Sequence, residues 1–394
     1  MEAKRRVLYI SYDCILEPLT SSQVLPYLKG LSRKNDIYLL TFNKARVSEG
    51  RLNSIAAANN LKGIFGLAYH KTPTLPATCF DITCGIIKGM SIIRRHGIAL
   101  VHARSHVSCA IAFALKRLSG VSYIFDVRGL LADERVDSGD WQKGSIVYRV
   151  VKFCEALMLK SSSGIVLLSS SGVNLLDDIQ RGSSARTTVI PTCVDTEIFS
   201  PPDPSRAVGG DLRLVYVGSL GTWYMLPEML DFFGAVKKAV RQSKFTILTW
   251  SDPVYITKAI REKGLDEGSI EVKRAPHEGV PSYLASSDAS IFFIRPTFSK
   301  RVSCPTKFAE ALSMGLPVVA NSGIGDIAHF IRKYSTGVVV DAFREESYKK
   351  AIDELMGMLK DRSGLSMRCR DLALAEFSLA SGIRKYEALY EAVT

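Results

Sequence analysis

The chain has 394 residues, of which 47% are hydrophobic and 23% charged. This length favours two domains, and the composition is that of a globular protein rather than a disordered, collagen-like or coiled-coil chain. Lys and Arg exceed Asp and Glu by 12, and residues 1–200 carry nine of these excess charges, with 25 basic and 16 acidic residues. A basic half of this kind attracts anions such as phosphorylated small molecules or lipid headgroups.

Several classes of protein are disfavoured by local patterns. No apolar run reaches the roughly 18 residues of a membrane span, since Lys88 and the basic cluster at residues 94–96 break the best candidate. The N-terminal residues lack the pattern of a signal peptide, so we expect a cytoplasmic protein. Basic residues occur in dispersed pairs without interleaved aromatic side chains, which argues against nucleic-acid binding.

Cysteine and histidine spacing gives no reason to expect a metal. The eight cysteines are scattered without a Cys-x-x-Cys pair, which favours free thiols over disulfides or a zinc knuckle. His102 and His106 have the spacing of a helical metal site, but His102 closes a predicted strand, so we expect no metal site there.

Two series of strand patterns alternate with helical patterns, which predicts parallel sheets covered by helices on both faces. Strands of the first series are expected at residues 7–11, 37–42, 98–103, 123–127, 164–168 and 188–190. Strands of the second series are expected at residues 212–218, 245–250, 270–273, 290–294, 318–320 and 337–340. Prolines and glycines at residues 199–210 interrupt both patterns and predict a linker between the series.

The elements predict an α/β protein of two facing Rossmann-like domains with an interdomain cleft. We place the domains at residues 1–200 and 211–376, followed by a C-terminal helix at residues 377–394 that packs back towards the N-terminal domain. Such sheets bind ligands beyond the carboxyl ends of their strands, so site residues are expected in the loops that follow the strands.

The most informative stretch lies at residues 295–317, a loop and a helix between two predicted strands. Pro305 suits the first turn of the helix and Gly315 its end. Phe308 belongs to the stripe that packs on the sheet, which leaves Lys307 and Glu310 on a more exposed part of the helix. The alternative is a solvated helix with an ordinary Lys-Glu pair.

The start of this helix is a candidate diphosphate site. Its backbone N–H groups and positive dipole end attract anions, and Lys300, Arg301 and Lys307 add full charges beside it. Glu310, one turn further, can accept hydrogen bonds from two neighbouring hydroxyls of a ribose.

Four segments resemble, in order along the chain, the retaining glycosyltransferases of family 4, which have the GT-B fold of two Rossmann-like domains. They are residues 17–26, residues 190–195 with Phe199, residues 277–284 and residues 305–320. The resemblance implies that Glu310 contacts the nucleotide ribose. This chain has Val302 where the family commonly has a second glutamate, and its loop at residues 218–224 lacks the two cations that many members carry there.

The resemblance and the loop positions together give the expected site. We expect Lys300, Arg301 and Lys307 to stabilise the leaving diphosphate in place of the missing cations and of a metal. The loop of Thr20 and Ser21 is implied to reach the donor sugar, or else its side chains only cap a helix. The expected donor-binding residues are Gly218, Ser219, Ser303, Thr306, Glu310, Thr20 and Ser21. The loop at residues 218–224 has an alternative reading as an ordinary strand-to-helix turn.

The densest charge pattern lies at residues 125–141. It begins at the end of a predicted strand and is expected to enter the cleft. Asp126 is a candidate catalytic residue, and the candidate acceptor-binding residues are Arg104, Arg128, Asp133 and Glu134. The alternative is a loop held by salt bridges of Arg128 and Arg135. Residues 144–161 read as a basic amphipathic helix that either contacts an anionic membrane surface or covers a sheet.

We therefore expect a glycosyltransferase that moves a sugar from a UDP- or GDP-sugar to a glycan or lipid-linked glycan in polysaccharide biosynthesis, with retention implied by the family. It needs no cofactor and is expected in the cytoplasm or peripherally on the inner face of the plasma membrane. The alternatives are a nucleotide-sugar epimerase of the same fold and a nucleotide-sugar-binding protein that has lost catalysis.

Overall fold

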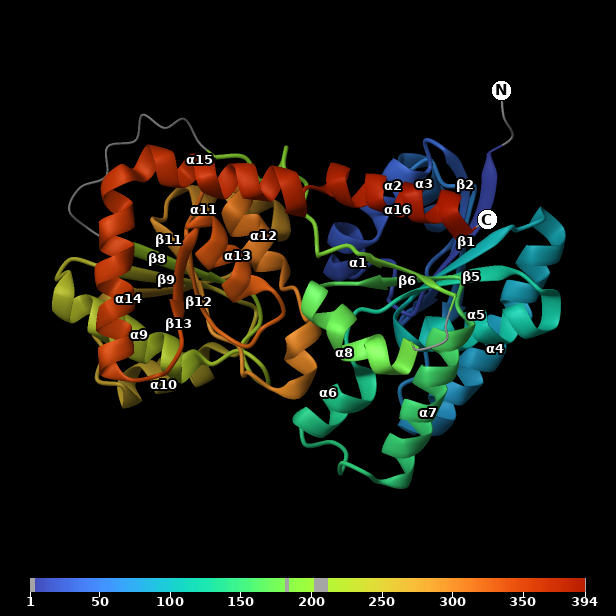
Figure 1. Cartoon of the computed structure of the whole chain (residues 1–394), viewed down its shortest axis with the longest axis horizontal. Helices are drawn as coiled ribbons and strands as arrows, with labels where there is room; N and C mark the ends of the chain where they lie inside the picture. Colours follow the sequence, from blue (N-terminus) through green and yellow to red (C-terminus); the bar gives the residue numbers. More distant parts are fainter. Residues whose placement is uncertain (1–3, 181–183, 202–211, 394) are drawn as a thin grey trace. The chain divides into compact units, whose positions relative to one another are not determined.

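The computed structural model describes residues 4–180, 184–201 and 212–393. It divides into two compact units, Met1–Pro191 with Leu379–Thr394 and Thr192–Ser378, each built on one parallel sheet (Figure 1). The predicted α/β class of two Rossmann-like domains is thereby confirmed. The predicted linker falls mostly on residues outside the described ranges, and the division itself lies between Pro191 and Thr192.

The first unit has a seven-stranded sheet in the order β3-β2-β1-β4-β5-β6-β7, with all neighbouring strands parallel. The strands are β1 (Arg5–Ser11), β2 (Asn35–Asn43), β3 (Gly63–Ala68), β4 (Leu100–Arg104), β5 (Ser122–Asp126), β6 (Gly164–Leu167) and β7 (Arg186–Val189). Apolar runs such as Val7–Ile10 are buried because helices cover both faces. β3 is a strand that the sequence patterns did not predict.

The helices of the first unit divide between the two faces of the sheet as right-handed crossovers require. On one face lie α1 (Pro18–Gln23), α2 (Leu25–Leu31), α3 (Glu49–Ala58) and α16 (Leu379–Val393), and on the other lie α4 (Thr74–His96), α5 (Ser105–Ser119), α6 (Leu131–Asp137), α7 (Ile146–Ser161) and α8 (Ser170–Gln180) (Figure 1). The C-terminal helix α16 packs against α2, so the end of the chain completes the first unit.

The second unit has a six-stranded sheet in the order β10-β9-β8-β11-β12-β13, again wholly parallel. The strands are β8 (Arg213–Val217), β9 (Lys244–Leu248), β10 (Ile270–Lys273), β11 (Ala289–Phe292), β12 (Val318–Asn321) and β13 (Gly337–Val340). The helices are α9 (Leu226–Ala239), α10 (Pro253–Glu262), α11 (Val280–Ala285), α12 (Thr306–Ser313), α13 (Ile327–Tyr334), α14 (Glu345–Met358) and α15 (Arg362–Leu372).

The strand order shows where each sheet can bind a ligand. In the second unit the chain leaves β8 in one direction towards β9 and β10, then returns to β11 on the other side of β8. Loops diverge at such a reversal and open a crevice at the carboxyl ends of the two strands. The loops after β8 and β11 are therefore the part of this unit best placed for a site.

Among the described residues, α4 is the one helix long and apolar enough to cross a membrane by length and composition. It packs tightly on α5, because a Cβ atom on Gly85 would lie 2.5 Å from Ile111 and one on Gly89 would lie 2.8 Å from Leu115. In this fold α4 therefore serves as the crossover helix between β3 and β4.

Candidate functional site

The loops after β8 and β11 are joined to each other by their backbones. Met225 donates its N–H to the carbonyl of Phe293 at 2.9 Å, and Arg295 donates to that of Trp223 at 2.8 Å. Residues 218–225 and 293–305 thus form a fixed rim around the start of α12, at the reversal of strand order. Because these hydrogen bonds hold the two loops together, they favour a preformed site over two independent turns.

Lys307 lies at the centre of this rim and is buried, with 8% of its surface exposed. Its ammonium nitrogen lies 3.4 Å from the ring centroid of Tyr224 and 4.1 Å from that of Tyr216. Among the described residues this nitrogen has no hydrogen-bond partner. Burial lowers the pKa of the Lys307 ammonium well below its ordinary value. A buried donor without an acceptor is costly and points to a ligand that supplies one.

Gly218 connects this lysine to the loop after β8. Its φ of +131° is reached easily only by glycine, and a Cβ atom there would lie 2.8 Å from the Lys307 nitrogen. The ammonium therefore lies directly against the backbone of this loop. An anion held by the loop would meet the lysine without an intervening side chain.

The start of α12 borders the same region. Pro305 occupies the N-cap position, and no side-chain hydrogen bond caps the helix there. Thr306 is the first helical residue and Ser303 lies half-buried just before it. The backbone N–H groups at the start of α12 and the hydroxyls of Ser303 and Thr306 are hydrogen-bond donors of the kind that bind a phosphate oxygen.

Glu310 lies one turn further along α12 and is buried beside His277. Its Oε1 is 3.2 Å from His277 Nε2, and this hydrogen bond raises the pKa of the imidazole. Phe199 packs against the same imidazole, with ring centroids 5.4 Å apart. In the sequence, His277 is part of the resembling segment at residues 277–284. Its place just after β10, at the carboxyl edge of the sheet, is the signal that could have identified it as a site residue.

The expectation that Lys307 and Glu310 are exposed is wrong, because both are buried in α12. α15 and residues 373–377 cover the outer face of this helix, while β12 lies on the other. Phe308 and Phe377 show the packing, with ring centroids 5.3 Å apart. The simple rule of one buried and one solvated face therefore fails here.

The other expected cations differ from Lys307. Lys300 is half-buried, and its nitrogen lies 3.9 Å from the ring centroid of Trp223, so it stays beside the loop after β8. Arg301 is exposed and lies against Phe298. Ser219 is exposed at the loop tip, where its carbonyl accepts a hydrogen bond from the Tyr216 hydroxyl.

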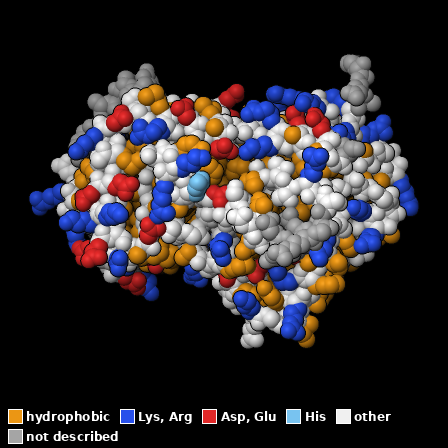
Figure 2. All heavy atoms as spheres, viewed as in Figure 1, with side chains coloured by type: hydrophobic (Ala, Val, Ile, Leu, Met, Phe, Trp, Pro, Cys, Tyr) orange, Lys and Arg blue, Asp and Glu red, His pale blue; other side chains and the backbone are white. Residues whose placement is uncertain are grey.

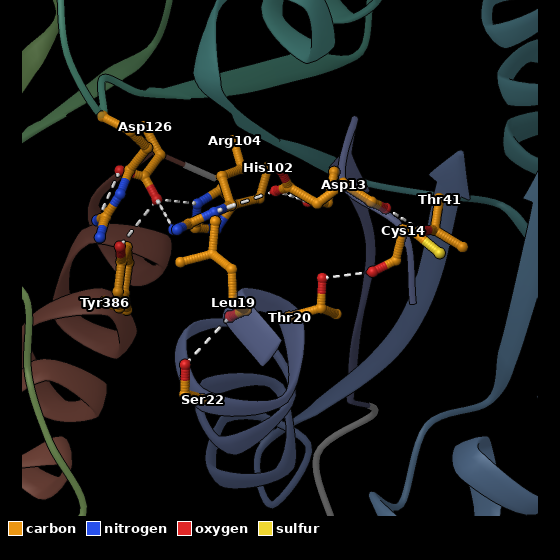
Figure 3. Close-up of polar contacts among 12 residues, drawn as sticks. Asp13, Cys14, Leu19, Thr20, Ser22, Thr41, His102, Arg104, Asp126 and Tyr386 are labelled. Carbon is orange, nitrogen blue, oxygen red and sulfur yellow. Dashed lines mark hydrogen bonds and ion pairs between the residues drawn. The ribbon is translucent and has the colours of Figure 1, made fainter. Parts of the chain in front are cut away.

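Two candidate residues of the first unit, Asp126 and Arg104, belong to a buried network instead of an open site (Figure 3). Asp126 is fully buried at the end of β5 and accepts a hydrogen bond from the Tyr386 hydroxyl at 3.0 Å. Its carboxylate also lies 3.4 Å from Arg128, 3.5 Å from His102 and 3.9 Å from Arg104. Burial alone would raise its pKa, but the Arg128 guanidinium, the contact with His102 and the Arg104 guanidinium outweigh burial and hold the pKa of Asp126 low.

The expectation that Asp126 enters a cleft as a catalytic group is thus wrong for its side chain, which points into the unit and is ion-paired. Arg104 is buried too and lies 3.7 Å from Asp13. The alternative of a salt-bridged segment describes Arg128, paired with Asp126, and Arg135, paired with Asp140 at 2.9 Å.

The remaining candidates of the first unit are tied to its own helices. Asp133 is buried and accepts hydrogen bonds from Tyr148 and Lys152 of α7, each at 3.1 Å. Glu134 is half-buried on α6. Thr20 is buried and donates to the carbonyl of Cys14, as Figure 3 shows.

Ser21 is exposed and donates a hydrogen bond to the carbonyl of Pro18 within α1. The metal-like pair is also separated by the fold. His102 lies on β4 and bonds Tyr390, whereas His106 lies on α5 and bonds Glu155.

Residues 211–358 match the family model described as "Glycosyl transferases group 1". No curated protein shows a significant match to the sequence. Several solved structures are similar to the chain over nearly its whole length. They include sucrose-phosphate synthase of Thermosynechococcus elongatus, with 14% identity, 98% of each chain covered and a TM-score of 0.74. They also include a glycosyltransferase of Rickettsia africae, with 14% identity, 99% of this chain and 98% of that one covered, and a TM-score of 0.72.

The HepE protein of Anabaena, solved in complex with UDP, is similar at 11% identity and a TM-score of 0.71, with 98% of this chain and 100% of that one covered. HepE has also been solved with UDP-glucose. At these identities the likeness shows the fold, which is that expected from the sequence. Residues 211–358 of the second unit are thus similar to the group 1 glycosyl transferases, and the chain as a whole has the GT-B fold of two Rossmann-like domains.

Proposed function

We propose that the chain transfers a sugar from a UDP-sugar to a glycan or lipid-linked glycan acceptor in polysaccharide biosynthesis, with retention of the anomeric configuration. The observation that carries the donor site is the buried Lys307 ammonium, which lies against Gly218 at the start of α12 without a hydrogen-bond partner among the described residues. UDP is the nucleotide bound by the structurally similar HepE protein, and this supports UDP over nucleotides with other bases.

Each residue of the rim has a distinct part in this proposal. The diphosphate takes the hydrogen bonds of the Lys307 ammonium and of the N–H groups at the start of α12. Lys300 and Arg301 add positive charge at the half-exposed rim, where negative charge grows on the leaving diphosphate during transfer. Such preorganised charges stabilise the transition state more than the ground state, because the charge on the leaving group is larger there.

Glu310 holds the ribose in the same proposal. One of its carboxylate oxygens is engaged by His277, which fixes the carboxylate and leaves the second oxygen for the ribose hydroxyls. In the first unit, the acceptor is proposed to bind to the exposed parts of the loop and helix that carry Arg128 and Glu134. The buried pairs around Asp126 hold those segments in shape.

Isothermal titration calorimetry with UDP, GDP, CDP and ADP tests the donor site. We expect UDP to bind most tightly, and we expect Lys307→Ala and Glu310→Ala each to weaken UDP binding at least about tenfold, the effect of one lost charged hydrogen bond. The matched controls are Lys349→Ala and Glu346→Ala, which change the same residue types on the exposed face of α14. Unchanged affinity in both site variants would refute the site.

Incubation of the donor separates transfer from its alternatives. Transfer requires an acceptor, whereas conversion of the sugar in the absence of any acceptor would favour an epimerase. Tight UDP-sugar binding without transfer to any member of a broad panel of glycans and lipid-linked glycans would favour a protein that has lost catalysis.

A further inference from the structure

Helix α7 exposes an apolar stripe that nothing in the donor site explains. Ile146 is 81% exposed and Phe153 is 64% exposed, and Val150 and Leu157 are exposed with them. Their spacing of four, three and four residues places all four side chains on one face of the helix. The helix packs on the unit through other residues, chiefly Met158 and Leu159. Large apolar side chains gathered on one exposed face mark a binding surface.

The surface continues across α5 onto α4. α5 packs against both α4 and α7, on the same face of the sheet. Ile87 of α4 is 68% exposed and Leu118 of α5 is 64% exposed. A shallow hollow lies between these two helices, and it is lined by Ile86, Ile87, Met90, Ser91, Leu118 and, at one end, Arg94 and Arg95.

The charge on these three helices has one sign. Together they carry eight Lys or Arg residues, namely Lys88, Arg94, Arg95, Lys116, Arg117, Arg149, Lys152 and Lys160. Their two acidic residues, Asp81 and Glu155, are both buried. Asp81 is engaged by Tyr12 and His70, and Glu155 by His106 and Lys152. The outer side of the three helices therefore presents exposed basic side chains and no exposed acidic side chain.

Figure 2 shows this combination on the lower right of the molecule, where orange and blue side chains alternate over the region that Figure 1 assigns to α7 and α4. Apolar side chains between long basic ones are what a bilayer surface requires. The apolar groups enter the layer between headgroups and acyl chains, while Lys and Arg extend to the phosphates.

We infer that the outer face of α4, α5 and α7 docks on an anionic lipid bilayer. The exposed Ile87, Leu118, Ile146, Val150, Phe153 and Leu157 enter the bilayer surface. The basic residues that are exposed beside them bind the lipid phosphates, namely Arg94, Arg95, Arg117, Arg149 and Lys160. Docking of this face requires neither donor nor acceptor. α4 stays packed on α5 in this arrangement and lies along the surface.

Co-sedimentation of the full chain with large unilamellar vesicles tests the inference. We expect binding to vesicles of phosphatidylcholine with about one third phosphatidylglycerol, and little binding to phosphatidylcholine alone. Binding should weaken as salt rises, because the basic residues act through screened charges. We expect Ile146→Ser with Phe153→Ser to lower the partition coefficient about tenfold or more, since each large apolar side chain contributes on that scale.

Matched variants distinguish loss of the docking surface on α4, α5 and α7 from a general effect of changing exposed apolar or basic residues. Met367→Ser with Leu374→Ser removes two exposed apolar side chains from the second unit and should leave binding unchanged. Arg94→Glu with Arg95→Glu should weaken binding to the anionic vesicles, whereas Lys349→Glu with Lys350→Glu on α14 should change it much less. Thermal unfolding of each variant should match the parent chain, because all these side chains are at the surface.

Three outcomes would overturn the inference. The first is no binding to anionic vesicles, and the second is binding that is insensitive to the Ile146 and Phe153 changes. The third is a dimer of the parent chain in light scattering that Ile146→Ser with Phe153→Ser dissociates, since a second copy would then cover the stripe. None of these outcomes involves UDP, so the proposed transfer reaction would stand or fall separately.

Discussion

At the scale of single residues, Lys307 shows a conflict between stability and binding. Its ammonium is buried between two tyrosine rings without a hydrogen-bond acceptor among the described residues. The aromatic faces offset part of the cost of burying the charge, but they do not replace the lost hydration. Such a residue is retained at a cost in stability when a ligand uses it.

We therefore predict that Lys307→Met stabilises the chain while it abolishes UDP binding. A methionine fills similar space without a charge, and replacing buried charge with apolar groups commonly stabilises by about 1 kcal/mol or more. Urea unfolding followed by tryptophan fluorescence at pH 7 measures the gain. Lys349→Met, on the exposed face of α14, is the control and should change stability by less than about 0.5 kcal/mol.

The same prediction has a defined dependence on pH. Because burial lowers the pKa of Lys307 in the folded state, the unfolded chain binds the proton more tightly, and stability rises with pH. The free-energy cost of burying the charged ammonium is complete at a pH below the pKa of Lys307 in the folded state. It disappears at a pH above the pKa of a lysine in the unfolded chain, about 10.4. The advantage of Lys307→Met should thus shrink as the pH rises. A variant less stable than the parent chain at pH 7 would show that Lys307 supports the fold.

At the scale of elements, helix α16 belongs to the first unit through close packing as well as polar contacts. Tyr386 and Tyr390 bond Asp126 and His102, and Lys34 forms an ion pair with Glu387 at 3.0 Å. The closest approach is at Gly30 of α2, where a Cβ atom would lie 2.1 Å from Cδ1 of Ile383.

This approach predicts coupling between Gly30 and Ile383. Gly30→Ala should destabilise the chain by about 1–2 kcal/mol, because the added methyl group forces Ile383 from its position. Ile383→Ala removes the obstruction, so the double variant should lose less stability than the two single losses together, as a double-mutant cycle of urea unfolding would show. Gly50→Ala on α3, which has open space around it, is the control and should not destabilise. Additive losses would contradict the packing.

The elements also show what sequence patterns can and cannot predict. Twelve strands were predicted because most of them have apolar runs that are buried on both faces, and the start of α12 near Pro305 followed from local preferences. β3 was missed because Gly63 and Gly66 weaken its pattern at the edge of the sheet. The burial of the Lys307 ammonium depends on Tyr216 and Tyr224, which are distant in sequence, and no local spacing encodes it.

At the scale of the whole molecule, the structure shows where basic residues of the positively charged residues 1–200 lie. The sequence shows that the first half is basic, but it does not show where the charges gather. The fold places eight of the 25 basic residues of this half on three neighbouring helices and buries the acidic residues of those helices. The proposed donor site in the second unit uses three cations, Lys300, Arg301 and Lys307, of which Lys307 is buried. In our two proposals, the basic residues of the three helices and the cations of the donor site therefore bind different ligands.

The two compact units also predict where a ligand stabilises the chain. If UDP binds the rim of α12, all the groups it contacts in that rim belong to the second unit, which has its own sheet and core. At a free UDP concentration about a hundredfold above the Kd, binding stabilises the folded unit by about 2.7 kcal/mol. Amides that exchange only through unfolding of that unit should then exchange up to about a hundredfold more slowly.

Hydrogen exchange followed by mass spectrometry checks this prediction peptide by peptide. We expect slowing over β8, β11, β12 and α12, and little change over β1, β4 and β5, because a ligand stabilises the cooperative core to which its contacts belong. Lys307→Ala at the same UDP concentration is the control, and its exchange should be slowed at least about tenfold less, because its affinity for UDP is lower by that factor. Slowing confined to β1, β4 and β5 would place UDP in the first unit and contradict the donor site. Equal slowing of both sheets would show instead that the two cores unfold as one.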